Sequence, residues 1–292
     1  MATRFSDPWK INADLHSHSH QSDGVLAPAE VASRAHAQGV QLWSLTDHDE
    51  LSGIVEAQRQ ADALGLRFVA GVEVSVTWAN KTIHILGLNV DPNHQQLNDG
   101  LATTRAGRID RAHEMAAGLA AVGINDAYQG ALRFVRNPNL IARTHFARFL
   151  VDAGHCTDTS EVFYRYLIEG KPGFVPHRWA KLHEAVGWIR AAGGEPVVAH
   201  PARYNFSETE SWAFFSEFAQ AGGNAIEIVS SSHSRDHIQR FSKLAQEFGF
   251  RGSRGSDFHS ADDSHVELGQ VATLPDSVLP VWSDWIDDEA MR

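Results

Sequence analysis

The amino-acid sequence predicts an α/β fold built around a mostly parallel sheet and interrupted by a helical insertion. Short apolar runs alternate with amphipathic helical patterns, which is the order expected of successive βα units. Between about residues 92 and 176 this alternation stops, and helical patterns follow one another without strands. The length of 292 residues fits one large α/β domain or about two smaller domains, and it allows a sizeable hydrophobic core.

The alternating part of the chain supplies the candidate strands and helices of the core. We expect strands at residues 11–15, 42–46, 68–72, 83–88, 196–199, 225–229 and 250–253. We expect helices at residues 28–38, 53–64, 180–192, 208–221 and 236–248. Pro28 near a helix start, and Gly65 and Gly249 just past helix ends, are the usual signals at helix termini.

The interrupted region is expected to form a helical insertion at residues 96–171, between a first core segment, 1–95, and a second, 172–292. One long helix is expected over residues 98–122, with Leu101, Ile109, Leu119 and Val122 among its apolar positions. Shorter helices are expected at residues 144–151 and 159–168. The chain would therefore leave the α/β core once and return to it.

The composition is that of an ordinary globular protein, with 43% hydrophobic and 21% charged residues. A net charge of −11 argues against a broad basic surface, so duplex DNA is not an expected partner. No run of 18 apolar residues and no signal-peptide pattern are present, so we expect a cytoplasmic protein without a membrane partner. Cys156 is the only cysteine, which excludes an internal disulfide and a thiolate zinc site.

Six short motifs place imidazole and carboxylate groups on or near the expected strands. His16 and His18 are spaced i, i+2, so both side chains project to the same side of an extended segment. Five motifs put their polar group at or just past the carboxyl end of a strand, where barrel-like α/β folds build active sites. His84 is the exception, because it lies inside its apolar run. The nine candidate metal ligands are His16, His18, Asp23, His48, Glu73, His84, His200, Asp257 and His259.

Nine such ligands exceed the needs of one tetrahedral zinc ion and suit two or three divalent ions. A mixed set of imidazole and carboxylate ligands is compatible with zinc, iron or manganese, so the residue types do not identify the metal. Three divalent ions and three carboxylates would leave a cavity charge of about +3, which suits a phosphate substrate. Taken alone, His84 or His200 is more simply a core histidine, and Asp47 a helix cap. The six motifs together favour a metal centre.

The motifs resemble those of the polymerase and histidinol phosphatase (PHP) family, within the amidohydrolase-like superfamily. The matching segments are DLHSHSHQSDG, LTDHD, GVEVS, VVAHP and GSDFH, together with the segment around His84. The segments IHILGLNVD, IARTHFAR, GKPGFVPHRW and AHPARY are similar to one subgroup, which contains 3',5'-nucleotide bisphosphate phosphatases and the 5'-to-3' exoribonuclease RNase AM. The resemblance covers residues 11–268, nearly the whole chain.

The resemblance implies a distorted (β/α)7 barrel with a helical insertion and up to three metal ions. Residues 1–95 and 172–292 would form the catalytic barrel, and residues 96–171 a lid over the substrate. The implied ligand sets are His16, His18, Glu73 and Asp257 for one ion, Glu73, His84 and His200 for a second, and Asp23, His48 and His259 for a third. We expect Mn2+ as the ion, with Zn2+ and Fe2+ as alternatives.

The expected reaction is in-line attack on phosphorus by a metal-bridging hydroxide held by Glu73. His177 and His233 are candidates for contacting the scissile phosphate or protonating the leaving oxygen. Asp14 and Asp47 are expected either to accept a hydrogen bond from a ligand imidazole or to hold a local turn. No P-loop is present, so nucleotide hydrolysis of that type is not expected.

The expected substrate is a nucleoside 3',5'-bisphosphate, such as adenosine 3',5'-bisphosphate, cut at its 3'-phosphoester to give the 5'-mononucleotide and phosphate. Its second phosphate would be held by residues drawn from Arg143, His145, Arg148, Lys171 and Arg203. The base would stack on Trp179, Phe174 or Tyr204. The 5' end of an RNA strand presents the same first linkage, so 5'-to-3' exoribonuclease activity fits the same geometry.

Two other functions compete with this interpretation. A phosphatase for another small metabolite, such as histidinol phosphate, would use the same metal centre, but the RTHFAR segment speaks against it. A non-catalytic PHP module that only binds proteins would be expected to have lost ligands, whereas all nine are present.

Overall fold

Seven strands follow one another around a nearly closed, barrel-shaped sheet in the computed structural model, which describes residues 7–176, 179–262, 264 and 266–285. Their order is β1-β2-β3-β4-β6-β7-β8, and a short strand, β5, pairs with β3. The strands are β1 (Ala13–Asp14), β2 (Leu42–Leu45), β3 (Arg67–Trp78), β4 (Lys81–Leu88), β5 (Ala180–Lys181), β6 (Glu195–Val198), β7 (Ala225–Ser230) and β8 (Arg251–Gly255). The fold class predicted from the sequence, a mixed α/β barrel, is confirmed.

The segments after β1 and β8 run side by side and bring the two ends of the sheet together. The Leu15 N–H donates to the Arg254 carbonyl (3.0 Å) and the Asp257 N–H to the His16 carbonyl (2.8 Å). The His18 N–H donates to the Phe258 carbonyl (2.8 Å). These backbone bonds connect the first and last metal motifs of the sequence, which are about 240 residues apart along the chain.

The sheet is less parallel than expected, because β4 runs antiparallel to both of its neighbours, β3 and β6. Only Ala79 and Asn80 connect β3 to β4, and both have positive φ, 45° and 62°. This is the backbone of a tight hairpin turn, which forces the next strand to return beside the first. Strand β3 also continues to Trp78, beyond the expected end at residue 72, so Glu73 lies inside a strand rather than after it.

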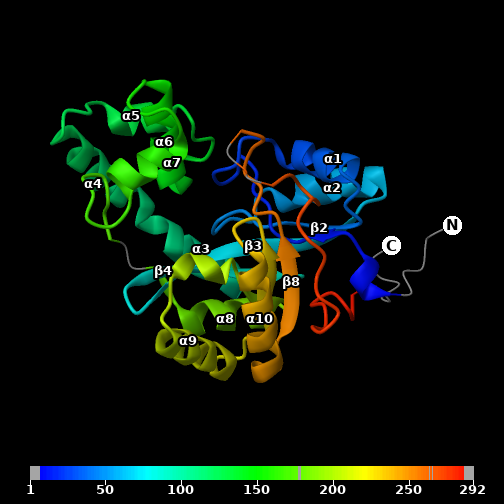
Figure 1. Ribbon diagram of the computed structural model, residues 1–292. Helices are drawn as coiled ribbons and strands as arrows, with labels where there is room; N and C mark the ends of the chain where they lie inside the picture. Colours follow the sequence, from blue (N-terminus) through cyan, green and yellow to red (C-terminus); the bar gives the residue numbers. More distant parts are fainter. Residues whose placement is uncertain (1–6, 177–178, 263, 265, 286–292) are drawn as a thin grey trace.

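Five helices cover the barrel (Figure 1): α1 (Pro28–Ala37), α2 (Ile54–Leu64), α8 (Leu182–Ala191), α9 (Glu208–Gln220) and α10 (Arg235–Phe248). Helices α2 and α10 end at Gly65 and Gly249, which adopt left-handed backbone with φ of 67° and 69°. This conformation carries little cost for glycine and closes the helix C-terminus, as the sequence predicted. No helix in the described part of the chain combines the length and apolar character needed to cross a bilayer.

The region between β4 and β5 is helical. Its elements are α3 (Gln95–Ala106), α4 (Arg108–Ala120), α5 (Ala127–Leu132), a 3-10 turn (Pro138–Leu140), α6 (Arg143–Asp152), α7 (Thr159–Val162) and a π-helical turn (Phe163–Leu167). Helix α3 lies against the barrel, whereas α4 to α7 stand to one side of it in Figure 1. The side chains of Met115, Leu119, Phe146, Leu150 and others form a buried cluster of their own. We refer to helices α4 to α7 as the lid helices. The domain boundaries at residues 96 and 171 stay a prediction.

The single long helix expected over residues 98–122 is wrong, because the chain breaks at Gly107 between α3 and α4. Leu97 and Leu101 of α3 pack into the barrel core, whereas Met115 and Leu119 of α4 pack into the lid cluster. The two halves bury their apolar faces against different partners, and glycine is a poor helix former at the point where they diverge. Helix α5 was not predicted.

Two helical glycines allow a matched test of the packing between α4 and the segment that returns to the barrel. A Cβ added at Gly118 would lie 1.9 Å from the Pro172 carbonyl oxygen, whereas one added at Gly187 in α8 would meet nothing within 4 Å. We expect Gly118→Ala to lower the free energy of unfolding by about 1–3 kcal/mol through overpacking. Gly187→Ala should raise it by about 0.5–1 kcal/mol through helix propensity. Urea denaturation measures both, and equal shifts would contradict the close contact.

Candidate metal centre

The nine predicted ligands come together at one end of the barrel, although they derive from six separate segments. His16 and His18 follow β1, His48 follows β2, and His200 follows β6. Asp257 and His259 follow β8, while Glu73 and His84 face each other from the β3–β4 hairpin. Seven of the nine line a cavity of about 360 Å3, and His16 and His18 are buried beneath it. The antiparallel hairpin explains how His84 reaches the site from inside a strand.

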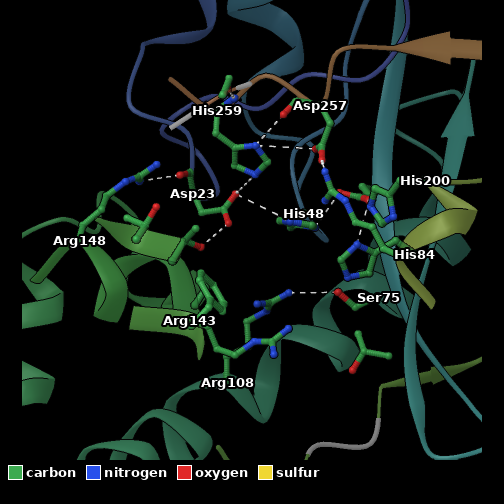
Figure 2. Close-up of a pocket in the computed structure, with 18 of the residues that line it drawn as sticks. Asp23, His48, Ser75, His84, Arg108, Arg143, Arg148, His200, Asp257 and His259 are labelled. Atoms are coloured by element: carbon green, nitrogen blue, oxygen red, sulfur yellow. Dashed lines mark hydrogen bonds and ion pairs between the residues drawn. The ribbon is translucent and has the colours of Figure 1, made fainter. Parts of the chain in front are cut away.

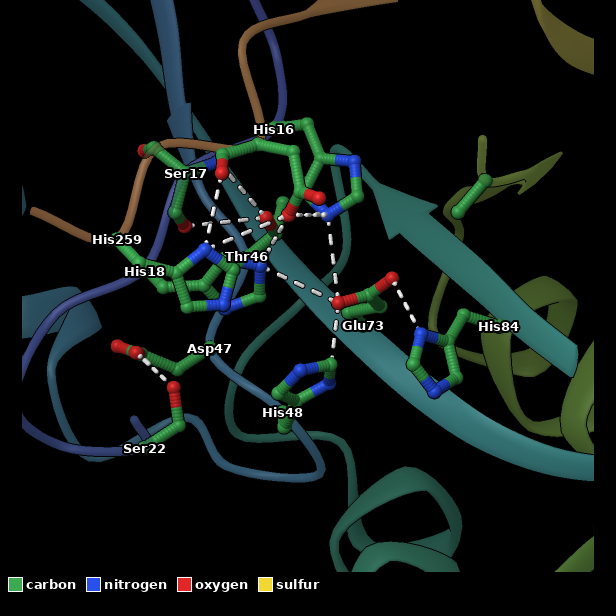
Figure 3. A network of polar contacts seen from close by, with 12 residues as sticks. His16, Ser17, His18, Ser22, Thr46, Asp47, His48, Glu73, His84 and His259 are labelled. Atoms are coloured by element: carbon green, nitrogen blue, oxygen red, sulfur yellow. Dashed lines mark hydrogen bonds and ion pairs between the residues drawn. The ribbon is translucent and has the colours of Figure 1, made fainter. Parts of the chain in front are cut away.

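Glu73 is the centre of the arrangement (Figure 3), and it is fully buried. Its Oε2 atom lies 3.3 Å from Nε2 of His16, 3.3 Å from Nε2 of His18 and 3.0 Å from Nδ1 of His48. Its Oε1 atom lies 2.9 Å from Nδ1 of His84 and 3.0 Å from Nε2 of His200. The two oxygens therefore face two different groups of imidazoles, as a bridging carboxylate must.

The ligand atoms form three groups. In the first cluster, atoms of His16, His18, Glu73 and Asp257 all lie within 4.8 Å of one another. The same holds for His48, Glu73 and His84 in the second cluster, beside which His200 also lies. The third group, which we name the Asp23 cluster, consists of His18, Asp23, His48 and His259. The first group is the expected one. The second contains His48 where His200 was expected, and the third contains His18 in addition to the expected Asp23, His48 and His259.

These residues fit divalent cations. Seven buried side-chain atoms of the predicted ligands have no hydrogen bond: His16 Nε2, His18 Nδ1, Asp23 Oδ1, His48 Nδ1, Glu73 Oε2, His84 Nδ1 and His200 Nδ1. A buried polar atom without a partner costs about 1–3 kcal/mol, and a bound cation would satisfy these atoms. The N···O separations around Glu73, 2.9 to 3.3 Å, are those of neighbouring ligands around an ion with bonds of about 2.0–2.2 Å. Burial alone would raise the pKa of Glu73, but the imidazoles of His84, His48 and His16 hold it well below its usual value.

Glu227 supports two of the predicted ligands, and its role was not predicted from the sequence. Its Oε1 atom accepts a hydrogen bond from Nδ1 of His16 (2.9 Å), which leaves Nε2 of that ring facing Glu73. Its Oε2 atom accepts the backbone N–H of His200 (2.5 Å), a residue with the unusual φ of 26°. Partners of this kind fix the orientation and tautomer of a metal-binding imidazole. The available signal was a carboxylate inside the otherwise apolar strand β7, 225–230.

Asp14 and Asp47 accept hydrogen bonds from backbone and hydroxyl groups, and in the described part of the chain from no ligand imidazole. Asp14 accepts the backbone N–H groups of Ser256 (2.9 Å) and Gly269 (2.7 Å). Asp47 accepts the N–H of Ser19 (2.8 Å) and the hydroxyl groups of Ser19 and Ser22, both at 2.6 Å (Figure 3). Both carboxylates therefore hold the loops that carry ligands, which corresponds to the local role that was left open.

The predicted substrate residues divide into two sets. Arg143, Arg148 and Arg203 line the cavity, and Arg203 also contacts Asp257, with 2.5 Å between Nη2 and Oδ2. His145 is buried and does not line the cavity, because its Nδ1 accepts the N–H of Ala142 (2.9 Å) at the start of α6. Lys171 also lies outside the cavity lining, with Nζ 5.3 Å from the centre of the Tyr164 ring.

The remaining candidates lie elsewhere or have structural partners. His233 does not line the cavity: Nδ1 donates to the Ile228 carbonyl (2.9 Å), and Nε2 accepts the Ala202 N–H (3.5 Å). Tyr204 is buried, and its hydroxyl donates to the Ala199 carbonyl (2.7 Å), so it offers no face for a base. Phe174 is not part of the cavity lining, whereas Trp179 is. His177 lies outside the described residues.

Two further arginines line the cavity from α4, and sequence reasoning missed them. Arg108 and Arg111 are buried, and their guanidinium carbons lie 4.6 and 5.4 Å from the centre of the Trp179 ring. Arg108 also pairs with Asp49. With Arg143 they form what we name the arginine cluster, part of which appears opposite the metal ligands in Figure 2. Their i, i+3 spacing on one helix face was the available signal.

The arginine cluster holds more positive charge than its surroundings neutralise. Burial, followed by the neighbouring Arg143 and Arg108, lowers the pKa of Arg111 to about 9. Burial and Arg108 also lower the pKa of Arg143. In the described part of the chain, neither Arg111 nor Arg143 has a carboxylate at ion-pair distance. An anion bound here would relieve both the repulsion and the burial of unpaired charge.

Comparisons with known proteins agree with one another. The model of the PHP domain matches residues 14–230. A 3',5'-nucleoside bisphosphate phosphatase from Chromobacterium violaceum is 46% identical over 273 residues, which are 94% of this chain and 96% of the relative. A 5'-3' exoribonuclease from Haemophilus influenzae is 40% identical over 269 residues, which are 92% of this chain and 97% of the relative. The solved structure of an amidohydrolase from Chromobacterium violaceum, with bound sulfate and no metal, has a TM-score of 0.91 and 46% identity over 96% of this chain and 97% of its own.

Removing the ions should destabilise the protein, because the buried ligand atoms would lose their compensating charges. An ion present at about 100 times its dissociation constant stabilises the folded state by about 2.7 kcal/mol. We therefore expect exhaustive chelation to lower the melting temperature and added Mn2+ to restore it, with bound metal counted by elemental analysis. Asp257→Asn should show a smaller response to Mn2+. A melting temperature that does not change on chelation would contradict a bound-metal centre.

His145 should make stability depend on pH. Burial lowers its pKa to about 4, below the value of about 6.5 in an unfolded chain. As the pH falls from 6.5 towards 4, the unfolded chain takes up a proton that the folded protein does not. Stability is therefore lost over this window, by up to about 1.4 kcal/mol per pH unit from this residue. Urea denaturation at several pH values should give a flatter profile for His145→Gln, and parallel profiles would refute the assignment.

Proposed function

The chain belongs to the PHP domain family, and from this premise we propose that it hydrolyses the 3'-phosphoester of nucleoside 3',5'-bisphosphates, giving the 5'-mononucleotide and phosphate. The observation that carries the proposal is the position of the arginine cluster, which lines the same cavity as the metal ligands. The cavity thus offers two separate places for phosphate. The Chromobacterium violaceum relative, named for this activity, covers nearly the whole chain.

Bound divalent ions would neutralise charge on the scissile phosphate and lower the pKa of water enough to supply hydroxide near neutral pH. The nine ligands would hold these ions, and Glu73 would bridge the first two clusters. Glu227 keeps Nε2 of His16 directed at Glu73 by holding Nδ1. Arg203, ion-paired to Asp257 and half-exposed at the cavity, can also reach a phosphoryl oxygen.

The second phosphate would bind the arginine cluster. Arg108 already has Asp49 as a partner, which leaves Arg143 and Arg111 as the groups with uncompensated charge. Trp179 holds the planes of Arg108 and Arg111 by cation–π contact, so the forked donors are arranged before the substrate binds. Lys171 and His145, which were expected to help, do not line the cavity and drop out of this proposal.

The cavity between the two phosphate sites suits a nucleoside. A volume of about 360 Å3 lies in the usual range for small-ligand pockets, about 300–1,000 Å3. Hydroxyl groups of Ser75, Thr159, Ser160, Ser231 and Ser264 line it and can bond ribose. With the 5'-phosphate at the arginine cluster, the 3'-ester would point towards the metal ligands.

A 5'-to-3' exoribonuclease activity is the second proposal, and the Haemophilus influenzae relative of that name favours it. The first linkage of an RNA strand is also an ester of a 3'-oxygen, so the same bond would be cut. In that case only the first nucleotide would lie in the cavity, and the rest of the RNA strand would extend out of it on the far side of the scissile phosphate. Histidinol phosphate has no second phosphate, so it would leave the positive charge of the arginine cluster without a bound anion.

We propose Mn2+ as the native ion, with Zn2+ and Fe2+ as its competitors. The donor set mixes imidazole, which suits zinc and iron, with carboxylate, which suits manganese. Elemental analysis of protein purified without added metal would decide among them. Catalytic rates restored by each ion after chelation would show which ion supports turnover.

Arg143→Ala should separate the two phosphate sites. We expect kcat/KM for adenosine 3',5'-bisphosphate to fall about 10- to 100-fold, the effect of losing about 1.5–3 kcal/mol of charged hydrogen bonding. Hydrolysis of an aryl phosphate, which has no second phosphate, should stay within about two-fold because the metal centre is intact. Arg133→Ala is the control, since Arg133 is exposed on the lid and pairs with Asp152.

The same assay should include 3'-monophosphates, histidinol phosphate and 5'-phosphorylated oligoribonucleotides. Equal losses on the bisphosphate and the aryl phosphate would remove Arg143 from substrate binding. Preference of the wild-type protein for histidinol phosphate would overturn the proposed function itself.

A further inference from the structure

Asp23, one of the predicted metal ligands, is held by two residues of lid helix α6. The Thr144 hydroxyl donates to Oδ2 of Asp23 at 2.5 Å. Nη1 of Arg148 donates to the backbone carbonyl of Asp23 at 2.6 Å. Figure 2 shows Asp23 between Arg148 and His259. The lid therefore contacts a ligand of the metal centre directly, through both its side chain and its backbone.

The two oxygens of Asp23 face different partners. Oδ1 is buried without a hydrogen bond and lies 3.3 Å from Nε2 of His259 and 3.8 Å from Nε2 of His48. Oδ2 points the other way and is tied to Thr144. The hydroxyl thus fixes the rotation of the carboxylate so that one oxygen is presented to the cluster. Without it, the carboxylate would be free to turn away from His48 and His259.

A second lid helix reaches the same part of the metal centre. Arg108 of α4 pairs with Asp49, the neighbour of His48 in the sequence. Asp49 in turn accepts the N–H (2.7 Å) and hydroxyl (2.9 Å) of Ser75, and its own N–H donates to the carbonyl of Glu73 (2.9 Å). Both lid contacts therefore act on residues of the Asp23 cluster or on their direct neighbours.

We propose that Thr144 and Arg148 are positioning residues for Asp23, so that the affinity of the Asp23 cluster for its ion depends on the placement of α6. Partners that orient a metal ligand commonly change metal affinity by about 10- to 100-fold. Helix α6 begins at Arg143, a member of the arginine cluster. If Arg143 binds a phosphate, which rests on the proposed function, a nucleotide and this ion must each tighten the binding of the other.

The test of the positioning role uses Mn2+ alone and the full-length protein. Equilibrium dialysis against a range of Mn2+ concentrations gives the number of bound ions and the affinity of the weakest site. We expect Thr144→Val to weaken one site about 10- to 100-fold and Thr144→Ser, which keeps the hydroxyl, to restore it. Thr103→Val is the matched control, because within the described residues the Thr103 hydroxyl donates to the Asp99 carbonyl of its own helix, α3 (3.0 Å), and has no contact with the metal centre. Arg148→Gln, as a second variant, should weaken the same site.

Circular dichroism and melting curves of each variant establish that it is folded before its metal binding is compared. Unchanged Mn2+ affinity in both folded variants, Thr144→Val and Arg148→Gln, would overturn the positioning role. Weakening of every site to the same extent would also overturn it, because it would indicate a general loss of structure.

Repeating the titration with adenosine 5'-monophosphate tests the linkage separately. The nucleotide should tighten the weakest Mn2+ site in the wild type and in Thr144→Ser, and do so much less in Thr144→Val. Equal tightening in all three proteins would overturn the linkage. Failure of the nucleotide to bind the wild-type protein would count against the proposed function, while the result with Mn2+ alone would still decide the role of Thr144.

Discussion

The buried carboxylate of Glu73 is the constraint on which the rest of the structure depends. A charge at this depth is tolerated only when opposite charge and hydrogen-bonding groups surround it, and here five imidazoles approach its two oxygens. The antiparallel β3–β4 hairpin places His84 beside it, and the joining of β1 to β8 places His16 and His18. The irregular features of the barrel are therefore those that bring ligands to this one residue.

Charge is separated across the cavity. The barrel contributes carboxylates and imidazoles, which attract cations, whereas the lid contributes most of the arginines, which attract anions. Arg203 is a barrel arginine, and it is paired with Asp257. Without ligands, each side buries polar or charged groups that have no partner. Cations would stabilise the barrel side, and a phosphate group would stabilise the lid side. Asp23 and Asp49 are the exceptions, since these barrel carboxylates bond to the lid and connect the two sides.

The sequence was informative where function depends on local spacing. The i, i+2 pairs and the strand-end positions identified most of the residues that the structure brings together, because alternation along an extended chain is a local property. His84, inside an apolar run, and Asp23, on a loop, were recognised as candidates from residue type and their neighbouring motifs. The antiparallel direction of β4 follows from a two-residue turn, Ala79-Asn80, that contains no glycine to mark it in the sequence. The helix break at Gly107 arises because α3 packs against the barrel core and α4 against the lid cluster. Glu227, Arg108 and Arg111 acquire their roles only through contacts with distant segments. For the same reason, the sequence left two roles open for Asp14 and Asp47.

The placement of the insertion has a consequence for how the chain folds. Leu88 of β4 pairs with Glu195 of β6, so over 100 residues separate two neighbouring strands. Closing so long a loop costs conformational entropy, and slow folding is typical of such distant pairings. The lid helices have a buried cluster made almost entirely of their own local contacts, which can form early and bring the two strand ends closer. The segment that contributes arginines to the cavity would then also shorten the search by which the barrel closes.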